Sequence, residues 1–255
     1  MQVAAYQPPL AVTRSPEVFD AIAEQVARCE AAGVRILCCP EGVLGGLADY
    51  VVAADRLVLP ADAGKLAGAL APIGSATVTT IVGYTECDDA GRLFNAAAVL
   101  DRGTVVGRYR KRHPAIRRSV YTAGDETPVF TVGPLTFGIL LCRDSNFAEL
   151  ARGMVASGAV ALFVPTNNGL PTDRSHASVA AHARRTDVAC AAEHGVSVIR
   201  ADVAGAAFGL FSYGCTEVVG PDGRVLAEAP PLESGLIFAD IPIEPRAGTA
   251  SPSGA

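Results

Sequence analysis

The sequence predicts one α/β domain whose mixed β-sheets carry helices on their outer faces. Half of the 255 residues are apolar, and a chain of this length can bury about three quarters of its unfolded surface. Segments with strand-like and helix-like apolar spacing alternate along the chain, and no Pro/Gly/Ser-rich linker divides it. Several successive strand-like segments are joined only by short turns, which pairs them as hairpins. This pattern favours mixed sheets over a purely parallel doubly wound sheet.

The first third of the chain contributes two predicted helices and two predicted strands. Residues 3–6 form an apolar strand-like segment. Ser15 and Pro16 then suit the N-cap and first position of a helix whose apolar spacing continues to Gly33. A short strand over residues 34–39 follows, and residues 61–73 show a second helical pattern.

The remaining segments predict a meander, a hairpin and a final series of helices and strands. The meander covers residues 77–84, 93–100 and 104–109, and the hairpin joins residues 128–132 to 135–141. The later helices are predicted at 147–157 and 175–194, and the later strands at 160–164, 196–200, 216–219, 224–227 and 236–241. We expect the domain to cover residues 1–243, with a flexible tail over 244–255.

Composition excludes several classes of protein. The net charge of -5 argues against a nucleic-acid partner. Seven cysteines without a Cys-x-x-Cys pair indicate neither a disulfide framework nor a zinc knuckle. His176 and His182 lie six residues apart, a spacing that does not place them on one face of a helix. The chain has no signal-peptide pattern and no apolar run near the roughly 20 residues that span a bilayer. We therefore expect a cytoplasmic protein without a metal site or a membrane contact.

Three segments each present one reactive side chain at the end of an apolar run, where we expect it to be exposed. Glu41 follows the strand that ends at Pro40, Lys111 lies at the end of the meander, and Cys142 follows the second strand of the hairpin. A carboxylate, an ammonium and a thiol can act as the base, the electrophilic stabiliser and the nucleophile of acyl transfer. The combination suggests an enzyme that cleaves a carbon–nitrogen bond through a thioester.

Each of these residues also has an ordinary structural interpretation. Cys142 could be a buried strand-end cysteine, Glu41 a solvated loop residue and Lys111 one more cation in a basic run. The polar residues 143–146, however, place the thiol at a strand-to-helix turn, where free backbone N–H groups can face an oxyanion. His113 offers a rival base, as in a Cys/His protease, and an enzyme of that class should survive Glu41→Gln.

The three segments together resemble the signature of the nitrilase, or carbon–nitrogen hydrolase, superfamily. The matching patterns are a Glu after an apolar strand, a Lys in a Tyr-Arg-Lys-x-His context and a Cys followed by x-Asp-x-x-Phe-x-Glu. Further similarity extends the resemblance over roughly residues 1–243, at Ala123-Gly124-Asp125, Gly158-Ala159, Val164-Pro165, Ala183-Arg184-Arg185, Tyr213-Gly214-Cys215 and Gly220-Pro221-Asp222-Gly223.

The resemblance implies a four-layer α-β-β-α sandwich in which Glu41, Lys111 and Cys142 meet at one pocket. Cys142 would attack the substrate, Glu41 would move the protons, and Lys111 with the backbone N–H of Arg143 would hold the oxyanion. No metal or organic cofactor is needed, and a homodimer or larger homo-oligomer is expected by analogy. The implied activity is hydrolysis of a small amide or N-carbamoyl compound with release of ammonia, ranked above nitrile hydrolysis.

One segment departs from the family pattern. Many members carry a second glutamate in the stretch that corresponds to residues 114–121, where this chain has no acid. Arg117, Arg118 or Ser119 occupies that place, and the change could alter substrate choice or mark a catalytically silent binding or regulatory scaffold. An arginine in the pocket would favour substrates that carry a carboxylate, a hypothesis that Arg117→Ala tests.

Four further residues lie near segments that border the site in relatives and are candidates for substrate contacts. Phe147 is more often a packing residue than a substrate contact, and the loop at residues 167–169 also suits a turn by its composition alone. The four candidates are Tyr50, Phe147, Asn167 and Asn168.

Overall fold

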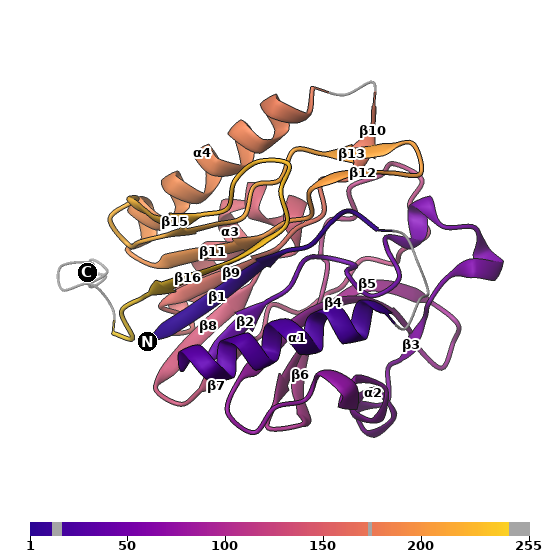
Figure 1. Cartoon of the computed structure of the whole chain (residues 1–255), viewed down its shortest axis with the longest axis horizontal. Coiled ribbons are helices and arrows are strands. Elements are labelled where there is room, and N and C mark those ends of the chain that lie inside the picture. The colour runs from indigo at the N-terminus through magenta and orange to yellow at the C-terminus, as the bar shows by residue number, and fades with distance from the viewer. Residues whose placement is uncertain (12–16, 173–174, 245–255) are drawn as a thin grey trace, which may run out of the picture.

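The computed structural model describes residues 1–11, 17–172 and 175–244, and two large mixed sheets form its centre (Figure 1). The first sheet has the strand order β16-β1-β2-β4-β5-β6, with β3 paired to β4. Strands β1, β2 and β4 are parallel neighbours, whereas β4, β5 and β6 form the predicted antiparallel meander. Its strands are β1 (Gln2–Gln7), β2 (Ile36–Cys38), β3 (Leu59–Pro60), β4 (Thr79–Cys87), β5 (Leu93–Asp101), β6 (Thr104–Arg110) and β16 (Gly235–Asp240).

The second sheet has the strand order β15-β14-β11-β9-β8-β7. Strands β8, β9 and β11 run parallel, and the outer strands on each side pair antiparallel. A small third sheet joins β10, β13 and β12. The strands are β7 (Val129–Val132), β8 (Leu135–Ile139), β9 (Ala161–Pro165), β10 (Leu170–Pro171), β11 (Ser197–Ala201), β12 (Gly205–Ala207), β13 (Leu210–Ser212), β14 (Glu217–Val219) and β15 (Val225–Glu228).

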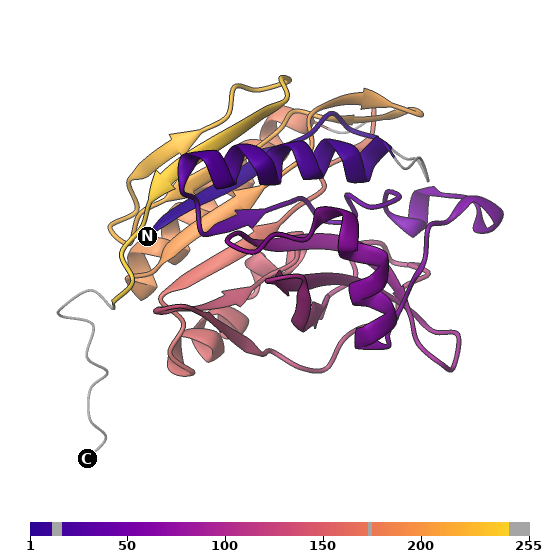
Figure 2. The same cartoon turned by 60° about the horizontal axis from the view of Figure 1, so that its bottom comes forward.

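Helices cover the outer face of each large sheet, which confirms the four-layer sandwich (Figures 1 and 2). Helices α1 (Glu17–Ala32) and α2 (Ala63–Leu70) pack on the first sheet. Helices α3 (Ala148–Ala156) and α4 (His176–His194) pack on the second. Among the described residues, no helix combines the length and apolar character that crossing a membrane requires.

The alternation of side chains along the first strand explains why two cores form. Val3 and Ala5 of β1 belong to the core between the two sheets, whereas Ala4 and Tyr6 belong to the core beneath α1. Successive side chains of a strand point to opposite faces, so a strand that is apolar on both faces must be covered twice. The burial pattern of β1 therefore selects a central strand of a layered fold.

Most predicted elements are present, with differences at their ends. The helix predicted over residues 61–73 is an α-helix only to Leu70 and continues as a 3-10 turn, Ala71–Ile73, which contains Pro72. Strands β3, β10, β12 and β13 were not predicted, because two or three residues carry no measurable periodicity. The helix start at Ser15-Pro16 and the tail beyond residue 244 lie outside the described residues.

Candidate active site

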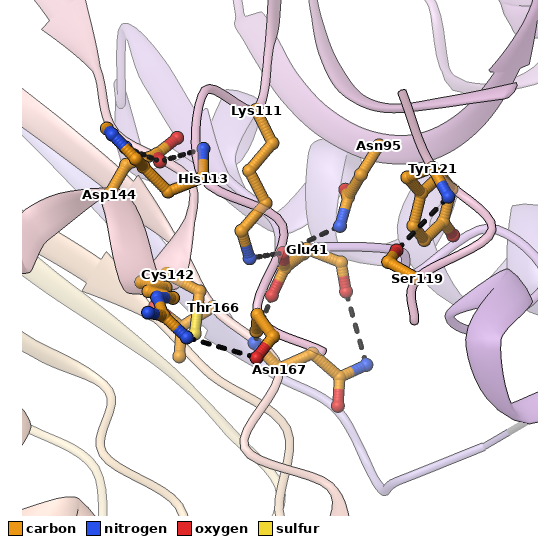
Figure 3. Close-up of polar contacts among 12 residues, drawn as sticks. Glu41, Asn95, Lys111, His113, Ser119, Tyr121, Cys142, Asp144, Thr166 and Asn167 are labelled. Carbon is orange, nitrogen blue, oxygen red and sulfur yellow. Dashed lines mark hydrogen bonds and ion pairs between the residues drawn. The ribbon is translucent and has the colours of Figure 1, made fainter. Parts of the chain in front are cut away.

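Strand ends from both sheets meet at one cavity of about 660 Å³. Glu41 follows β2 by three residues, Lys111 comes directly after β6, and Cys142 follows β8 by three residues. All three line the cavity, and Figure 3 shows their side chains side by side. The structure thus brings the predicted trio together. Glu41 and Lys111 are buried rather than exposed, at 1% and 3% exposure, so a ligand reaches them only through the cavity.

The Glu41 carboxylate is held by donors from three different elements. Nζ of Lys111 lies 2.5 Å from Oε1, and Nδ2 of Asn95 on β5 donates to the same oxygen at 2.8 Å. The backbone N–H of Asn167 donates to Oε2 at 3.2 Å. A buried ion pair is tolerated only when further hydrogen bonds compensate for lost hydration, and these two bonds supply that compensation.

The Lys111 ammonium is a permanent cation in this site. Burial alone would lower its pKa, but the negative charge of Glu41 and the hydrogen bond to Glu41 outweigh burial and raise the pKa above its ordinary value. The cation can therefore stabilise an oxyanion at neutral pH without first gaining a proton.

Cys142 begins a 3-10 turn, Cys142–Asn146, with a backbone φ of 47°. This left-handed conformation is costly for a residue other than glycine, and such strain clusters at functional sites. The hydroxyl of Ser145 donates to the Cys142 carbonyl at 2.8 Å and closes the turn. Burial, followed by the charge of Glu41, raises the pKa of the Cys142 thiol to about 12, so the thiol is neutral at rest.

The Cys142 thiol also contacts Asn168, whose side-chain orientation is fixed by hydrogen bonds to Asp202. Sγ of Cys142 lies 3.9 Å from Oδ1 of Asn168, as in a weak S–H···O hydrogen bond. The backbone N–H and the Nδ2 of Asn168 both donate to the Asp202 carboxylate, at 3.0 and 2.8 Å. Because a carboxylate accepts only, these bonds turn the amide oxygen of Asn168 toward the thiol.

Asp144 connects the turn that begins at Cys142 to the loop that follows Lys111. It is fully buried and accepts a hydrogen bond from the Tyr109 hydroxyl at 2.8 Å. It also accepts from the backbone N–H groups of Arg112 and His113, at 3.1 and 2.8 Å. One carboxylate thereby fixes the distance between the loop after Lys111 and the turn after Cys142 (Figure 3).

Arg200 supports the same turn from the second sheet. It lies at the cavity wall, is 2% exposed and pairs with Asp187 through two bonds of 2.6 Å. Its remaining donors reach the hydroxyls of Thr166 and Ser145, at 2.6 and 3.1 Å. Arg200, whose charge is balanced by Asp187, therefore holds both the turn that begins at Cys142 and the end of the strand before Asn167.

The other predicted contact residues divide into two groups. Tyr50, Arg117, Arg143, Asn167 and Asn168 line the cavity. Phe147 is absent from the residues that line it, and its ring stacks on His113 with centroids 3.5 Å apart. Its role as a substrate contact therefore has no support in the geometry, in keeping with the packing alternative.

Residues 114–121, the stretch that lacks the family's second glutamate, are held in place by Asp49. The hydroxyl of Ser119 and the backbone N–H of Val120 donate to Asp49, at 2.9 and 2.8 Å, and Asp49 lines the cavity. Of the three residues that could occupy the place of the family's second glutamate, Arg117 lines the cavity, whereas Arg118 and Ser119 do not.

His113 is committed to structural contacts. Its Nδ1 lies 3.0 Å from Asp144, and its ring stacks on Phe147. His182 lines the cavity, but its Nε2 lies 3.0 Å from Oδ1 of Asn146. The charges that act most strongly on the Cys142 thiol are instead those of Glu41 and Lys111. This arrangement disfavours the Cys/His protease alternative.

Sequence reasoning missed Asn95, Asp202 and the Arg200–Asp187 pair. Asn95 and Arg200 stand as single polar residues in apolar strand segments, a signal that marks a buried polar group. Their partners lie 54 and 13 residues away in the chain, so the sequence does not identify them.

Comparison with known proteins agrees with this geometry. A family model for carbon–nitrogen hydrolases matches residues 2–250, and the chain belongs to that family. The protein is therefore an enzyme that hydrolyses carbon–nitrogen bonds, as the resemblance in the sequence indicated.

Individual relatives extend the comparison. A Pseudomonas protegens protein described as a hydrolase in the pqqF 5' region is 32% identical, over 93% of this chain and 81% of that protein. An omega-amidase of Homo sapiens is 30% identical, over 66% of this chain and 63% of its own length. The crystal structure of an amidase from Nesterenkonia sp. superposes with a TM-score of 0.79 at 24% identity, over 96% of this chain and 91% of that chain.

Proposed function

We propose that the protein is an amidase that hydrolyses a small amide or N-carbamoyl compound to release ammonia, through a thioester on Cys142. The observation that carries this proposal is the buried Glu41–Lys111 ion pair, which shares one cavity with a neutral thiol. The omega-amidase among the relatives supports amide chemistry as the leading class.

In the proposed acylation step, Glu41 takes the Cys142 proton as the sulfur attacks the amide carbon. The carbonyl oxygen becomes an oxyanion between Nζ of Lys111 and the backbone N–H of Arg143, which lies in the first turn of a 3-10 helix. Glu41 then passes the proton to the nitrogen, the C–N bond breaks, and ammonia leaves.

In the proposed deacylation step, Glu41 takes a proton from water as the water oxygen attacks the thioester. The second tetrahedral intermediate collapses, the proton returns to the sulfur, and the carboxylic acid is released. The sum is one amide and one water converted to one acid and one ammonia. A carboxylate that both gives and takes protons must contact the nucleophile and the leaving group from one position, which its three anchoring bonds provide.

The charges on the cavity wall bear on substrate choice. Arg117 lines the cavity at an exposed position and can meet a substrate carboxylate. Asp49 lines the same cavity, but it is engaged by Ser119 and Val120. We therefore place amides with a distal carboxylate first among the substrates to test.

Ammonia release from a substrate panel tests the proposal. The panel contains neutral amides, amides with a distal carboxylate, N-carbamoyl amino acids and the matching nitriles. We expect turnover of at least one amide or carbamoyl compound, a loss of at least about 10³-fold in kcat with Cys142→Ala or Glu41→Gln, and an acyl-enzyme detectable by mass. Arg117→Ala should lower kcat/KM for acidic amides relative to neutral ones.

Two results would replace the proposal. Turnover confined to nitriles would assign the same trio to nitrile hydrolysis. A folded protein that converts no compound, and whose Cys142 acquires no acyl group, would indicate a silent scaffold that binds without hydrolysis.

A further inference from the structure

The cavity that holds Cys142 changes in character with depth. The buried residues that line it are largely polar and include Glu41 and Lys111. The exposed residues that line it include two cations, Arg117 and Arg143. The half-buried residues, intermediate in depth, are mostly apolar. A ligand that enters from solvent and reaches Glu41 therefore passes an apolar section of the cavity.

Side chains from separate elements build this apolar section. Leu47 lies in the loop after β2, Ile116 in the loop after β6, Leu170 on β10 and Val179 on α4, and we call these four residues the apolar wall. Each is half-buried, so the protein leaves part of its apolar surface uncovered. Covering that surface with an apolar group of a ligand is favourable, because it removes both from water.

Polar side chains at the same depth are already engaged within the protein. Asp49, Ser145 and Asn168 are also half-buried and line the cavity, and each makes a side-chain hydrogen bond to another residue of the chain. A ligand group at this depth therefore finds the apolar wall rather than a set of free hydrogen-bonding groups.

The cavity is also far larger than the group that reacts in it. At about 30 Å³ for each water molecule, 660 Å³ has room for roughly 20 waters, whereas an amide contributes one carbon, one oxygen and one nitrogen. In the proposed reaction the leaving group is ammonia, and the acyl group stays on Cys142. The remaining space must then be filled by the acyl side of the substrate.

We propose that the apolar wall binds the acyl group of the substrate, and that this group carries an apolar segment of several carbons next to the scissile amide. This inference rests on the proposed amidase function and deepens it by defining the acyl group. A distal carboxylate that meets Arg117 follows after this segment, so the shortest polar amides are poor substrates.

A series of straight-chain primary amides, from propanamide to hexanamide, measures the contribution of the wall. All members share the reacting group and the leaving ammonia, so kcat/KM for ammonia release reports only the acyl chain. We expect kcat/KM to rise about fourfold with each added methylene, or roughly 60-fold over the series.

Two substitutions in the apolar wall change the series in different ways. Leu170→Asn makes the wall polar and should lower the hexanamide-to-propanamide ratio of kcat/KM about fivefold or more. Val179→Phe fills part of the cavity and should move the preferred chain length toward shorter amides, which keeps the test open if the asparagine variant does not fold. Leu226→Asn is the matched control, because Leu226 on β15 is 43% exposed and is absent from the residues that line the cavity. It should keep the wild-type ratio.

The outcomes separate this inference from the amidase function. Equal or falling kcat/KM along the series, with ammonia released, would overturn the inference and leave the amidase function intact. If no amide releases ammonia, the proposed function fails, and calorimetric binding of the same series to Cys142→Ala protein decides the inference. Affinity that rises with chain length would then support the apolar wall as an acyl site, and equal affinities or no binding would overturn it.

Discussion

The reactivity of Cys142 is set by burial and by two opposite charges. Burial raises the thiol pKa to about 12, the Glu41 carboxylate adds to that increase, and the Lys111 ammonium opposes it. Because the thiol is neutral at rest, the thiolate must form as the substrate is attacked, and the proposed base, Glu41, lines the same cavity.

Alkylation by iodoacetamide distinguishes the charge of Glu41 from its action as a base. Iodoacetamide reacts with the thiolate already present, so the wild-type rate at Cys142 should rise steadily from pH 5 to 9 without a plateau. Glu41→Gln removes the charge that raises the thiol pKa, and alkylation of Cys142 should become several-fold faster at pH 8 even though turnover is lost.

Peptide mass after timed quenching gives the rate at each cysteine. The other six cysteines are also free thiols and serve as internal references. Lys111→Met should have the opposite effect and slow the alkylation of Cys142. Slower alkylation in the Glu41→Gln variant would contradict this electrostatic account.

At the residue scale, the sequence was sufficient to predict those cavity residues that follow the ends of apolar strands. Glu41, Lys111 and Cys142 could be predicted because each interrupts an apolar run with a reactive group. Asn95 and Asp202 could not, because their importance depends on which atoms they face across the fold. Phe147 was proposed as a substrate contact, but its position is explained by its stacking on His113.

At the element scale, β4 positions Glu41 through a close approach of two backbones. Gly83 lies opposite the turn that holds Glu41, and a Cβ built there would come within 2.3 Å of the Pro40 carbonyl oxygen and 2.7 Å of the Glu41 Cα. Only glycine allows this approach. The glycine in the β4 sequence is therefore part of how the site is built.

Gly83→Ala should impair catalysis by displacing Glu41. The added methyl group meets backbone rather than a flexible side chain, so the turn must move. We expect a loss of about 1–3 kcal/mol in the free energy of unfolding and at least a tenfold loss of kcat. Amide turnover and urea unfolding measure the two effects.

Gly68→Ala in α2 is the matched control, because a Cβ at that position meets nothing within 4 Å. It should raise stability by about 1 kcal/mol and leave turnover unchanged. Wild-type kcat in the Gly83→Ala variant would show that the backbone contact does not position the carboxylate.

The apolar periodicity of the sequence predicted which helices and strands exist. Their lengths depend on tertiary contacts, which the sequence does not show. The long helix at residues 176–194 and the meander were evident from the sequence. Strand β2, in contrast, was expected over residues 34–39 and is only Ile36–Cys38, because its end turns away to place Glu41 in the cavity.

At the scale of the whole molecule, the layered fold buries carboxyl groups on the second sheet. Glu217 on β14 is fully buried, with Nε of Arg184 donating to Oε2 at 2.8 Å, and Oε1 has no hydrogen-bond partner among the residues that the structure describes. Burial, followed by the charge of Asp187, raises the Glu217 pKa to about 7. Burial likewise raises the pKa of Asp202 to about 6.

These raised pKa values fix the sign of the pH dependence of stability. Between its ordinary pKa of 4.5 and about 7, Glu217 keeps its proton in the folded protein and loses it in the unfolded chain. Stability linked to this group is thus fully present below pH 4.5 and is lost as the pH rises toward 7. The loss is of the order of 3 kcal/mol for Glu217, and Asp202 acts in the same direction at lower pH.

Glu217→Gln should therefore flatten the stability profile. The glutamine cannot ionise, so we expect the free energy of unfolding to fall less between pH 4.5 and 8 than in the wild type, by about 3 kcal/mol. Urea unfolding at several pH values gives the slope. Glu228 contacts the same Arg184 from an exposed position, with 54% of its side chain accessible, so Glu228→Gln should keep the wild-type slope. Equal slopes in the wild type and Glu217→Gln would show that the buried carboxyl is ionised at all these pH values, and that Arg184 compensates fully for its burial.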